Sequence, residues 1–418
     1  MSLARLAVVA VVATLLGLGR PAAAEKARPE DAFVQASNAF AVDLYQRLRA
    51  GPGNLFFSPT SVSTALDMTW AGARGQTAGE MAKVLRLGRP PQRVHAAGAR
   101  LVQRLVVADA ALPEIRIANR LWVQQGLPLE PAFAKLVAQH YAAGVEPVDF
   151  VGAAEAARLT INRWVESRTA GKITDLLPAK VLDREARLVL TNAIYFKGAW
   201  VTPFAPRATR PASFTVVPGT TRTVPMMHGV LPEEKVRYAE VADAQVLELP
   251  YRSDRRDRAL AMVVILPREV DGLARLEAGL TPPKLKAWLA KLSPTEVKLY
   301  LPRFNVTQSL ALGETLVAMG MRRAFSRKDA DFSGLTRKEP ICLAFVQHQA
   351  FVQVNEAGTE AAAATAVGGA KANGGGGPRL FRADHPFVFL IRDVSSGAIL
   401  FLGRLHDPTP PAGAPTRP

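Results

Sequence analysis

The second half of the chain is built from short apolar runs, and this pattern restricts the fold more than any other feature. From about residue 185 these runs are bounded by Gly, Pro or Asp and are rich in β-branched and aromatic residues. They read RLVLTNAIYF, QVLELPY, ALAMVVILP, EVKLYLPRFNV, ICLAFVQHQAFVQV, HPFVFLIRD and GAILFLGRL. Nearly continuous apolar runs are typical of strands that are covered on both faces of their sheet.

Helical patterns dominate the first third of the chain. One helical face contains the apolar residues Phe33, Phe40, Leu44 and Leu48. TAGE at residues 77–80 has the signature of a capping box, and residues 153–170 form another helical stretch that Gly171 would end. The 418 residues contain no internal repeat and no long linker, so we expect one α+β domain from residue 31 to 406.

The N-terminus has the pattern of an export signal. MSLARLAVVAVVATLLGLGRPAAAEK places Arg5 before an apolar run, and small residues follow that run up to Ala24. We expect residues 1–24 to be a signal peptide and the mature protein to be secreted, either extracellular or periplasmic. The run is too short for a good membrane span, so no membrane partner is expected. The Pro-rich residues 407–418 are expected to form a disordered tail.

Charge and cysteine content narrow the function only slightly. The formal net charge of +16 is compatible with binding to nucleic acid, a polyanion or a membrane surface. The cations are scattered, however, so we expect a basic soluble surface and no nucleic-acid partner. Weak polyanion binding stays an alternative. Cys342 is the only cysteine, so stability must come from packing rather than from an internal disulfide.

The sequence contains no recognisable catalytic motif. GxSxG, HExxH, CxxC and P-loop patterns are all missing, and the six His residues show no metal-ligand spacing. We therefore expect neither an enzyme nor a bound metal or cofactor.

NEAGTEAAAATAV, at residues 355–367, allows two interpretations. As a helix it would begin at Thr359, but a run of about two turns is marginal on its own. As a strand it would show Thr359, Ala361, Ala363, Thr365 and Val367 on one face, and Glu360 with further alanines on the other. Such small side chains can enter a packed sheet without displacing neighbours, and Gly358 would be a pivot. The composition suits a segment that is exposed at first and inserted later.

At these residues the chain resembles the serpins, the serine protease inhibitor family. The resemblance covers about residues 31 to 406. It is carried by NLFFSPTSVSTALDMTWAGARGQT, LTNAIYFKGAW, LPRF, MGMRRAFS, DFSGL, VNEAGTEAAAATAV and HPFVFLIRDVSSGAILFLGRL. It implies a fold of three β-sheets and eight to nine helices with an exposed reactive-centre loop, here residues 355–380. It also implies that a protease cuts this loop and is trapped when the cut loop inserts into the main sheet.

The resemblance further implies roles for individual residues. The hinge that enters the sheet first would contain Glu356, Gly358, Thr359, Glu360, Ala361, Ala362, Ala363 and Ala364. A polar cluster beneath the main sheet, the shutter, would contain Ser58, Ser61, Asn192 and His348; its rival interpretation is an ordinary buried hydrogen-bond network. Trp200 would mark the upper opening point near Glu356, or else serve only as a buried core aromatic.

The position of the cut is open within one residue. In the family it falls about sixteen residues after the hinge Glu, a span suited to one long strand. Counting from Glu356 gives Ala372, next to Asn373, whereas Lys371 precedes it directly. Cleavage after Lys371 would indicate a trypsin-like partner, and cleavage after Ala372 an elastase- or subtilisin-like one, which the small neighbouring residues slightly favour.

We therefore expect a secreted, monomeric serine protease inhibitor that acts as a suicide substrate. The main alternative is a non-inhibitory serpin that serves as a carrier, chaperone or storage protein. The hinge favours inhibition, because Thr359 and the alanines that follow Glu360 include no Pro or bulky residue. A second alternative is regulation by a polyanion on a helix containing Arg89, Arg93, Arg100 and Arg104.

Overall fold

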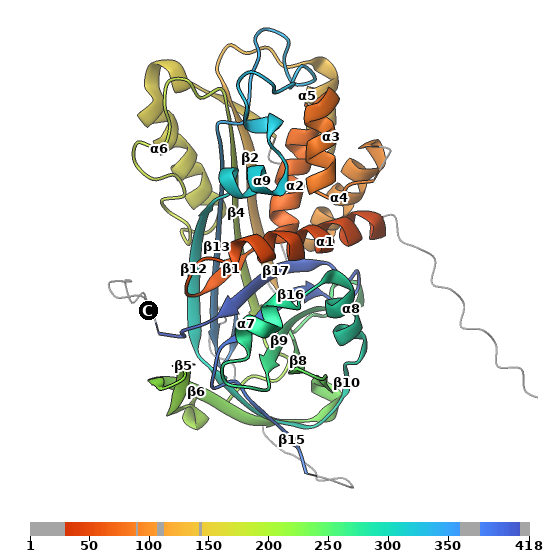
Figure 1. Cartoon of the computed structure of the whole chain (residues 1–418), viewed down its shortest axis with the longest axis vertical. Coiled ribbons are helices and arrows are strands. Elements are labelled where there is room, and N and C mark those ends of the chain that lie inside the picture. Colours follow the sequence, from red (N-terminus) through yellow and green to blue (C-terminus); the bar gives the residue numbers. More distant parts are fainter. Residues whose placement is uncertain (1–29, 89–90, 107–112, 142–143, 360–376, 410–418) are drawn as a thin grey trace, which may run out of the picture.

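The computed structural model describes residues 30–88, 91–106, 113–141, 144–359 and 377–409. Over these ranges the chain forms nine α-helices and three β-sheets, which confirms the predicted α+β class. Figure 1 shows the long strands of one sheet running through the upper half of the molecule, with most of the helices beside them.

The helices have the following bounds: α1 Asp31–Leu48, α2 Pro59–Trp70, α3 Gly75–Val84, α4 Pro91–Leu105, α5 Pro131–His140, α6 Phe150–Arg168, α7 Leu273–Ala278, α8 Pro282–Ala290 and α9 Gly313–Met319. Helix α1 buries the apolar face that its sequence predicts, including Phe33, Phe40 and Leu44. Helix α2 begins where Ser58 caps it, because the Ser58 hydroxyl accepts a hydrogen bond from the Ser61 amide at 3.2 Å.

The capping box predicted at residues 77–80 does not form. Helix α3 begins at Gly75, two residues before Thr77, and has no side-chain cap. The Thr77 hydroxyl instead accepts a hydrogen bond from the Asp331 amide at 2.9 Å, and Glu80 accepts one from the Arg323 amide at 2.8 Å. Both polar side chains therefore hold distant segments against the helix rather than cap it.

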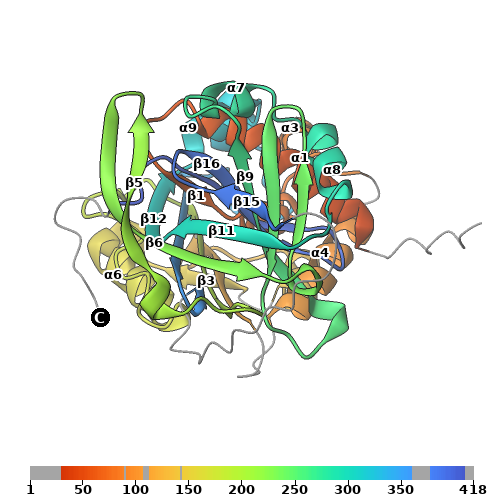
Figure 2. The same ribbon diagram turned by 90° about the horizontal axis from the view of Figure 1, so that it is seen from below.

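The three sheets have six, seven and four strands, and the six-stranded one is called the main sheet. The main sheet contains, in spatial order, β12 (Phe304–Ala311), β13 (Phe345–Asn355), β14 (Gly358–Thr359), β4 (Leu188–Ala199), β2 (Glu114–Gln124) and β3 (Val145–Val148). The seven-stranded sheet contains β1 (Leu55–Phe57), β17 (Ile399–Leu405), β16 (Phe387–Asp393), β9 (Leu260–Pro267), β8 (Ala244–Pro250), β7 (Arg237–Glu240) and β10 (Ser293–Pro294). The four-stranded sheet contains β15 (Arg379–Arg382), β11 (Val297–Pro302), β6 (Thr220–Leu231) and β5 (Arg210–Val217), and Figure 2 shows it from below.

Burial explains why the apolar runs became strands. Strands β9 and β17 are buried along their whole length, and β4 and β16 nearly so. Helices α2 and α6 cover opposite faces of the main sheet: the start of α2 lies against Asn119 and Asn192, whereas α6 packs on Trp122 and Val189. The run EVKLYLPRFNV supplies two strands rather than one, because the chain passes from the four-stranded sheet to the main sheet at Arg303.

The packed part of the chain extends beyond residue 406. The Asn54 side chain donates a hydrogen bond to the Asp407 carbonyl at 2.7 Å and accepts one from the Asp407 amide at 2.9 Å. Pro408 is buried and Thr409 half-buried. The sequence predicts a disordered tail from residue 407, whereas residues 407–409 pack against the fold.

Candidate functional site

A tight turn at the end of β13 carries the first candidate residues. The chain reverses after Asn355, and β14 returns antiparallel to β13 with Thr359 opposite Val354. On its other side β14 pairs with β4, where Thr359 lies opposite Gly198. Gly358 and Thr359 therefore lie between β13 and β4, at one end of the main sheet.

This placement differs from a hinge that is exposed at first. Gly358 and Thr359 are buried and paired on both sides. The reversal is stabilised by Asn355, whose side-chain oxygen accepts hydrogen bonds from the amides of Ala357 at 3.0 Å and Gly358 at 3.2 Å. The remaining predicted hinge residues and the three candidate cleavage residues lie outside the described residues; they are Glu360, Ala361, Ala362, Ala363, Ala364, Lys371, Ala372 and Asn373.

Gly358 is required by close approach rather than by flexibility alone. Its φ angle is +152°, and a Cβ atom added there would lie 2.1 Å from the carbonyl oxygen of Gly198 and 2.7 Å from the Cα of Ala199. No side chain fits between the two strands at this point. The pairing of β14 with β4 therefore depends on glycine at position 358.

Gly358→Ala is expected to expel β14 from the main sheet, because the added methyl group overlaps the backbone of β4. Hydrogen exchange at the amides of residues 357–359 would report the expulsion as a loss of protection of about tenfold or more. Gly377→Ala is the matched control, since a Cβ there meets nothing within 4 Å. Unchanged protection in Gly358→Ala would contradict the close approach.

Two aromatic residues, Tyr251 and Trp200, hold β14 and the turn that precedes it. The Tyr251 hydroxyl lies 2.7 Å from the Thr359 hydroxyl, and the Tyr251 ring stacks on Trp200 with centroids 4.6 Å apart. Trp200 bonds the turn at both ends: its indole N–H donates to the Asn355 carbonyl at 3.0 Å and its amide to the Ala357 carbonyl at 2.9 Å. Burial raises the pKa of Tyr251 well above its ordinary value, so this hydroxyl keeps its proton. Trp200 thus bonds the residues on both sides of Glu356.

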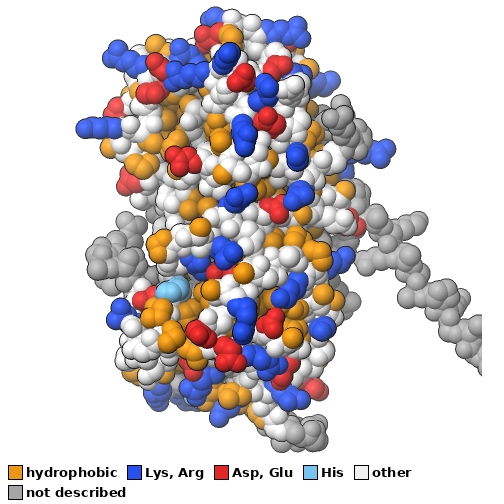
Figure 3. All heavy atoms as spheres, in the orientation of Figure 1, with side chains coloured by type: hydrophobic (Ala, Val, Ile, Leu, Met, Phe, Trp, Pro, Cys, Tyr) orange, Lys and Arg blue, Asp and Glu red, His pale blue; other side chains and the backbone are white. Residues whose placement is uncertain are grey.

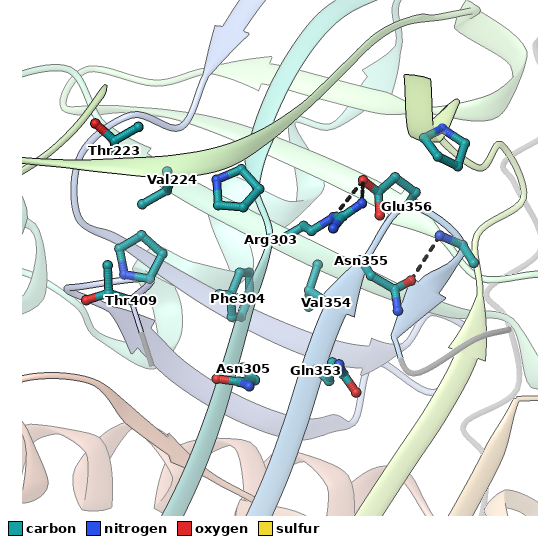
Figure 4. A pocket seen from close by; sticks show the side chains of 14 residues that line it. Thr223, Val224, Arg303, Phe304, Asn305, Gln353, Val354, Asn355, Glu356 and Thr409 are labelled. Carbon is teal, nitrogen blue, oxygen red and sulfur yellow. Dashed lines mark hydrogen bonds and ion pairs between the residues drawn. The ribbon is translucent and has the colours of Figure 1, made fainter. Parts of the chain in front are cut away.

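Glu356 connects the turn to the four-stranded sheet. Its side chain is only 9 % exposed, and its carboxylate accepts hydrogen bonds from Thr209 and from Arg303, whose Nε lies at 2.6 Å. Burial disfavours the charged carboxylate, but the hydrogen bonds from Arg303 and Thr209 outweigh it and hold the pKa of Glu356 below its ordinary value. Figure 4 shows this ion pair on one wall of a pocket of about 550 Å³, with Phe304 and Val354 below it.

The four predicted shutter residues meet beneath the middle of the main sheet. His348 in β13 lies opposite Asn192 in β4 and accepts a hydrogen bond from the Ser58 amide at 3.1 Å. The Asn192 side chain donates to the Ser61 hydroxyl at 2.6 Å and accepts from His348. Asn119 in β2, opposite Asn192, completes the cluster and accepts from the Ser61 hydroxyl at 3.0 Å. Because β13 and β4 pair directly here, the cluster bonds the two strands together.

A comparison with protein families decides which family this chain represents. The family model described as Serpin (serine protease inhibitor) matches residues 35–408. The chain belongs to the serpin family. Serpins are protease inhibitors rather than enzymes, and in general they target serine proteases.

Individual relatives match this serpin over nearly its whole length. The leukocyte elastase inhibitor of Homo sapiens is 38% identical over 383 residues, covering 89% of this chain and 98% of that protein. An uncharacterized serpin-like protein of Thermococcus kodakarensis is 40% identical over 385 residues, covering 91% of this chain and 86% of its own. The crystal structure of human thyroxine-binding globulin with its ligand has a TM-score of 0.81 and 31% identity, and covers 92% of this chain and 100% of that one.

The protonation state of His348 follows from its partners in the serpin. The Ser58 amide donates to Nε2, so Nε2 carries no proton and Nδ1 donates to the Asn192 oxygen. Burial lowers the pKa of His348 to about 3. The imidazole is therefore neutral, and both ring nitrogens are used within the shutter.

Acid is expected to weaken the serpin through His348. Because the folded-state pKa is depressed, the unfolded chain binds a proton at about pH 6.5 that the folded chain does not, and stability is lost as the pH falls between these values. The free energy of unfolding should fall by on the order of 1 kcal/mol per pH unit below about pH 6.5 from this group alone. Urea unfolding at a series of pH values would measure it, with His348→Gln as the non-titrating comparison. Equal slopes in parent and variant would contradict the neutral imidazole.

Of the four arginines proposed to bind a polyanion, Arg93 and Arg100 are exposed, whereas Arg104 is bound within the fold. Arg104 in α4 is ion-paired with buried Asp393 at 2.7 Å and donates to the Asp257 carbonyl at 3.0 Å. Arg89 lies outside the described residues. On the face seen in Figure 3, Lys and Arg side chains are spread over the surface with Asp and Glu among them. Within the described ranges, no group of three or more His, Cys, Asp or Glu is arranged to hold a metal ion.

Proposed function

We propose that this serpin is a secreted inhibitor of serine proteases that acts as a suicide substrate. The observation that carries the proposal is the register of β14 between β13 and β4. The protease serine would attack the carbonyl carbon at the cut, and the peptide bond would break. The residue after the cut would leave as a free amine, while the hinge side of the loop stays bound to the serine as an ester. Insertion of the loop behind Thr359 would then distort the bound protease before the ester is hydrolysed.

Continuing the register of β14 gives each later residue a neighbour. Residues 360–364 would pass between β13 and β4 with their side chains alternating between the two faces of the sheet. Thr359 faces the core, since its hydroxyl meets buried Tyr251. Ala361 and Ala363 would therefore face the core as well, whereas Glu360 would face the other side, between Gln353 and exposed Lys197. The inserted loop would thus present small side chains to the close-packed core, which has little free volume.

The same register leads through the shutter. Thr365 would lie between His348 and Asn192, which are now paired directly. Insertion to that depth requires the hydrogen bond between these two side chains to break. The shutter would thus oppose insertion until the cut frees the loop, which gives the buried network a role beyond stability.

Intact-mass spectrometry after denaturation would test the proposal. The mature protein would be mixed in turn with trypsin, pancreatic elastase and subtilisin. A covalent adduct is expected with at least one of them, and the released C-terminal peptide would show whether the cut follows Lys371 or Ala372. Cleavage by all three without an adduct would overturn the inhibitory reading and favour a non-inhibitory carrier, chaperone or storage protein.

Export is the second half of this proposal. Its support is the pattern of Arg5, the apolar run and the small residues before Glu25. Among the described residues, no helix has the length and apolar content needed to cross a membrane. Expression with the N-terminus intact should yield a secreted, monomeric protein whose first residue is Glu25, as read by intact mass and light scattering. Retention of residues 1–24 on the secreted protein would contradict the predicted cleavage.

A further inference from the structure

The turn at residues 355–357, called the hinge turn below, lines a pocket that also contains Thr409, the last residue that the structure describes. Residues 355–357 and Arg303 form one side of the pocket. Thr223, Pro408 and Thr409 form the other side. Figure 4 shows Thr409 and Thr223 on the opposite side from the Arg303–Glu356 pair, with Phe304 and Val354 between them. The pocket therefore connects the last described residues with the turn that delivers β14.

The chain enters this pocket in a fixed direction. The Asp407 carboxylate accepts hydrogen bonds from the Thr409 amide at 2.9 Å and from the Thr409 hydroxyl at 2.6 Å. Asn54 holds the Asp407 backbone, and Pro408 is already buried against the pocket wall. Thr409 precedes a proline, which biases its backbone toward an extended conformation.

We propose that residues 410–418, PPAGAPTRP, occupy this pocket and hold the hinge turn in place. The walls are mainly apolar, through Val224, Pro225, Phe304 and Val354. Proline offers apolar surface without an N–H group, so Pro410 and Pro411 leave no buried donor unsatisfied. A polyproline segment spans about 3.1 Å per residue, so only the first few of these residues are needed to reach the turn.

The consequence is that the C-terminal segment braces the turn that contains Asn355 and Glu356. The turn connects β13 to β14 within the main sheet, and residues 355–357 form part of the pocket wall. A segment that fills the pocket keeps the turn from moving away from Trp200 and Thr209. This inference concerns the resting protein and does not depend on protease inhibition.

Hydrogen exchange followed by mass spectrometry would test the bracing. Three proteins that all keep the fold up to Thr409 would be compared. They are the parent, a chain that ends at Thr409, and a chain in which a Gly-Ser segment of equal length replaces residues 410–418. Amides of residues 357–359 are expected to exchange at least about fivefold faster in both altered chains than in the parent. Peptides from β16 and β17 serve as the folding control, because residues 407–409 and their contacts with Asn54 are kept. The synthetic peptide PPAGAPTRP, added to the chain that ends at Thr409, should restore protection.

Three outcomes would overturn the proposal. Equal exchange in all three proteins would show that the segment does not touch the turn. Full protection by the Gly-Ser segment would show that the prolines are not recognised. Protection in the parent that increases with protein concentration would show that a second copy, rather than the chain's own segment, fills the pocket.

Discussion

Replacing Ala363 with Glu is expected to convert the protein from an inhibitor into a substrate. If the register of β14 continues, Ala363 faces the core between Ala350 and Ile194, which are 0% and 2% exposed. A carboxylate at this point would be buried without a partner, at a cost of several kcal/mol. Insertion would stop before the protease is distorted, and the acyl-enzyme would be hydrolysed. The yield of adduct should fall about tenfold or more while cleavage continues, as read by gel and mass spectrometry.

Ala362→Glu is the matched control for this variant. Its side chain would face the other side of the sheet, beside half-buried Phe351 and on the face toward which Glu360 would also point. Trapping should therefore decrease much less than in Ala363→Glu. If the two variants lost adduct equally, the inserted loop would not follow the register that β14 begins.

Asn192→Ala is expected to weaken the shutter more than any other single truncation in the main sheet. Asn192 bonds His348, Ser61 and Asn119 at once, and all of these groups are buried. Each buried polar group left without a partner costs about 1–3 kcal/mol, so a total loss of about 2–4 kcal/mol in the free energy of unfolding is expected. Urea denaturation at constant pH would measure it.

The neighbouring strand position provides the control for Asn192→Ala. Gln349 follows His348 in β13 on the opposite face of the sheet, and its buried side-chain oxygen accepts no hydrogen bond from the described residues. Gln349→Ala should therefore change the free energy of unfolding by less than about 1 kcal/mol. A loss in Gln349→Ala as large as that in Asn192→Ala would mean that the cost reflects side-chain volume rather than the hydrogen-bond network.

The apolar patterns predicted the buried strands well and the exposed ones poorly. Strands β4, β9, β16 and β17 are buried on both faces, so their sequences carry a continuous apolar run. The hairpin of β5 and β6 was not predicted, because half of its residues are exposed and its apolar residues form no continuous run. Its turn did carry a signal, the Pro218–Gly219 pair, in which Gly219 has a φ of +82°.

Some residues of the candidate site were predicted from the sequence, and others were not. The resemblance to serpins placed Ser58, Ser61, Asn192 and His348 in one cluster, and the structure brings them together. Asn119 and Tyr251 were missed, although a polar residue within an apolar strand and a Tyr at a strand end are weak signals for such roles. Insertion of Gly358 depends on the backbone of Gly198 in β4, and the ion pair of Glu356 depends on Arg303. Contacts between segments so distant in the chain leave no local pattern in either sequence.

The direct pairing of β13 with β4 has a consequence for how the protein behaves when concentrated. This is a parallel ladder, less stable per residue than an antiparallel one, and β14 shows that an antiparallel strand is accepted between the two. The space between β13 and β4, called the seam below, selects an inserted strand by its side chains. A strand of the same sequence from another molecule would fit there equally well. The chain's own Gly358–Thr359 segment prevails because the turn at residues 355–357 holds it next to the two strands, which amounts to a high effective concentration. Heating or crowding that loosens the seam would let another copy's loop compete, and the molecules would then link through exchanged strands.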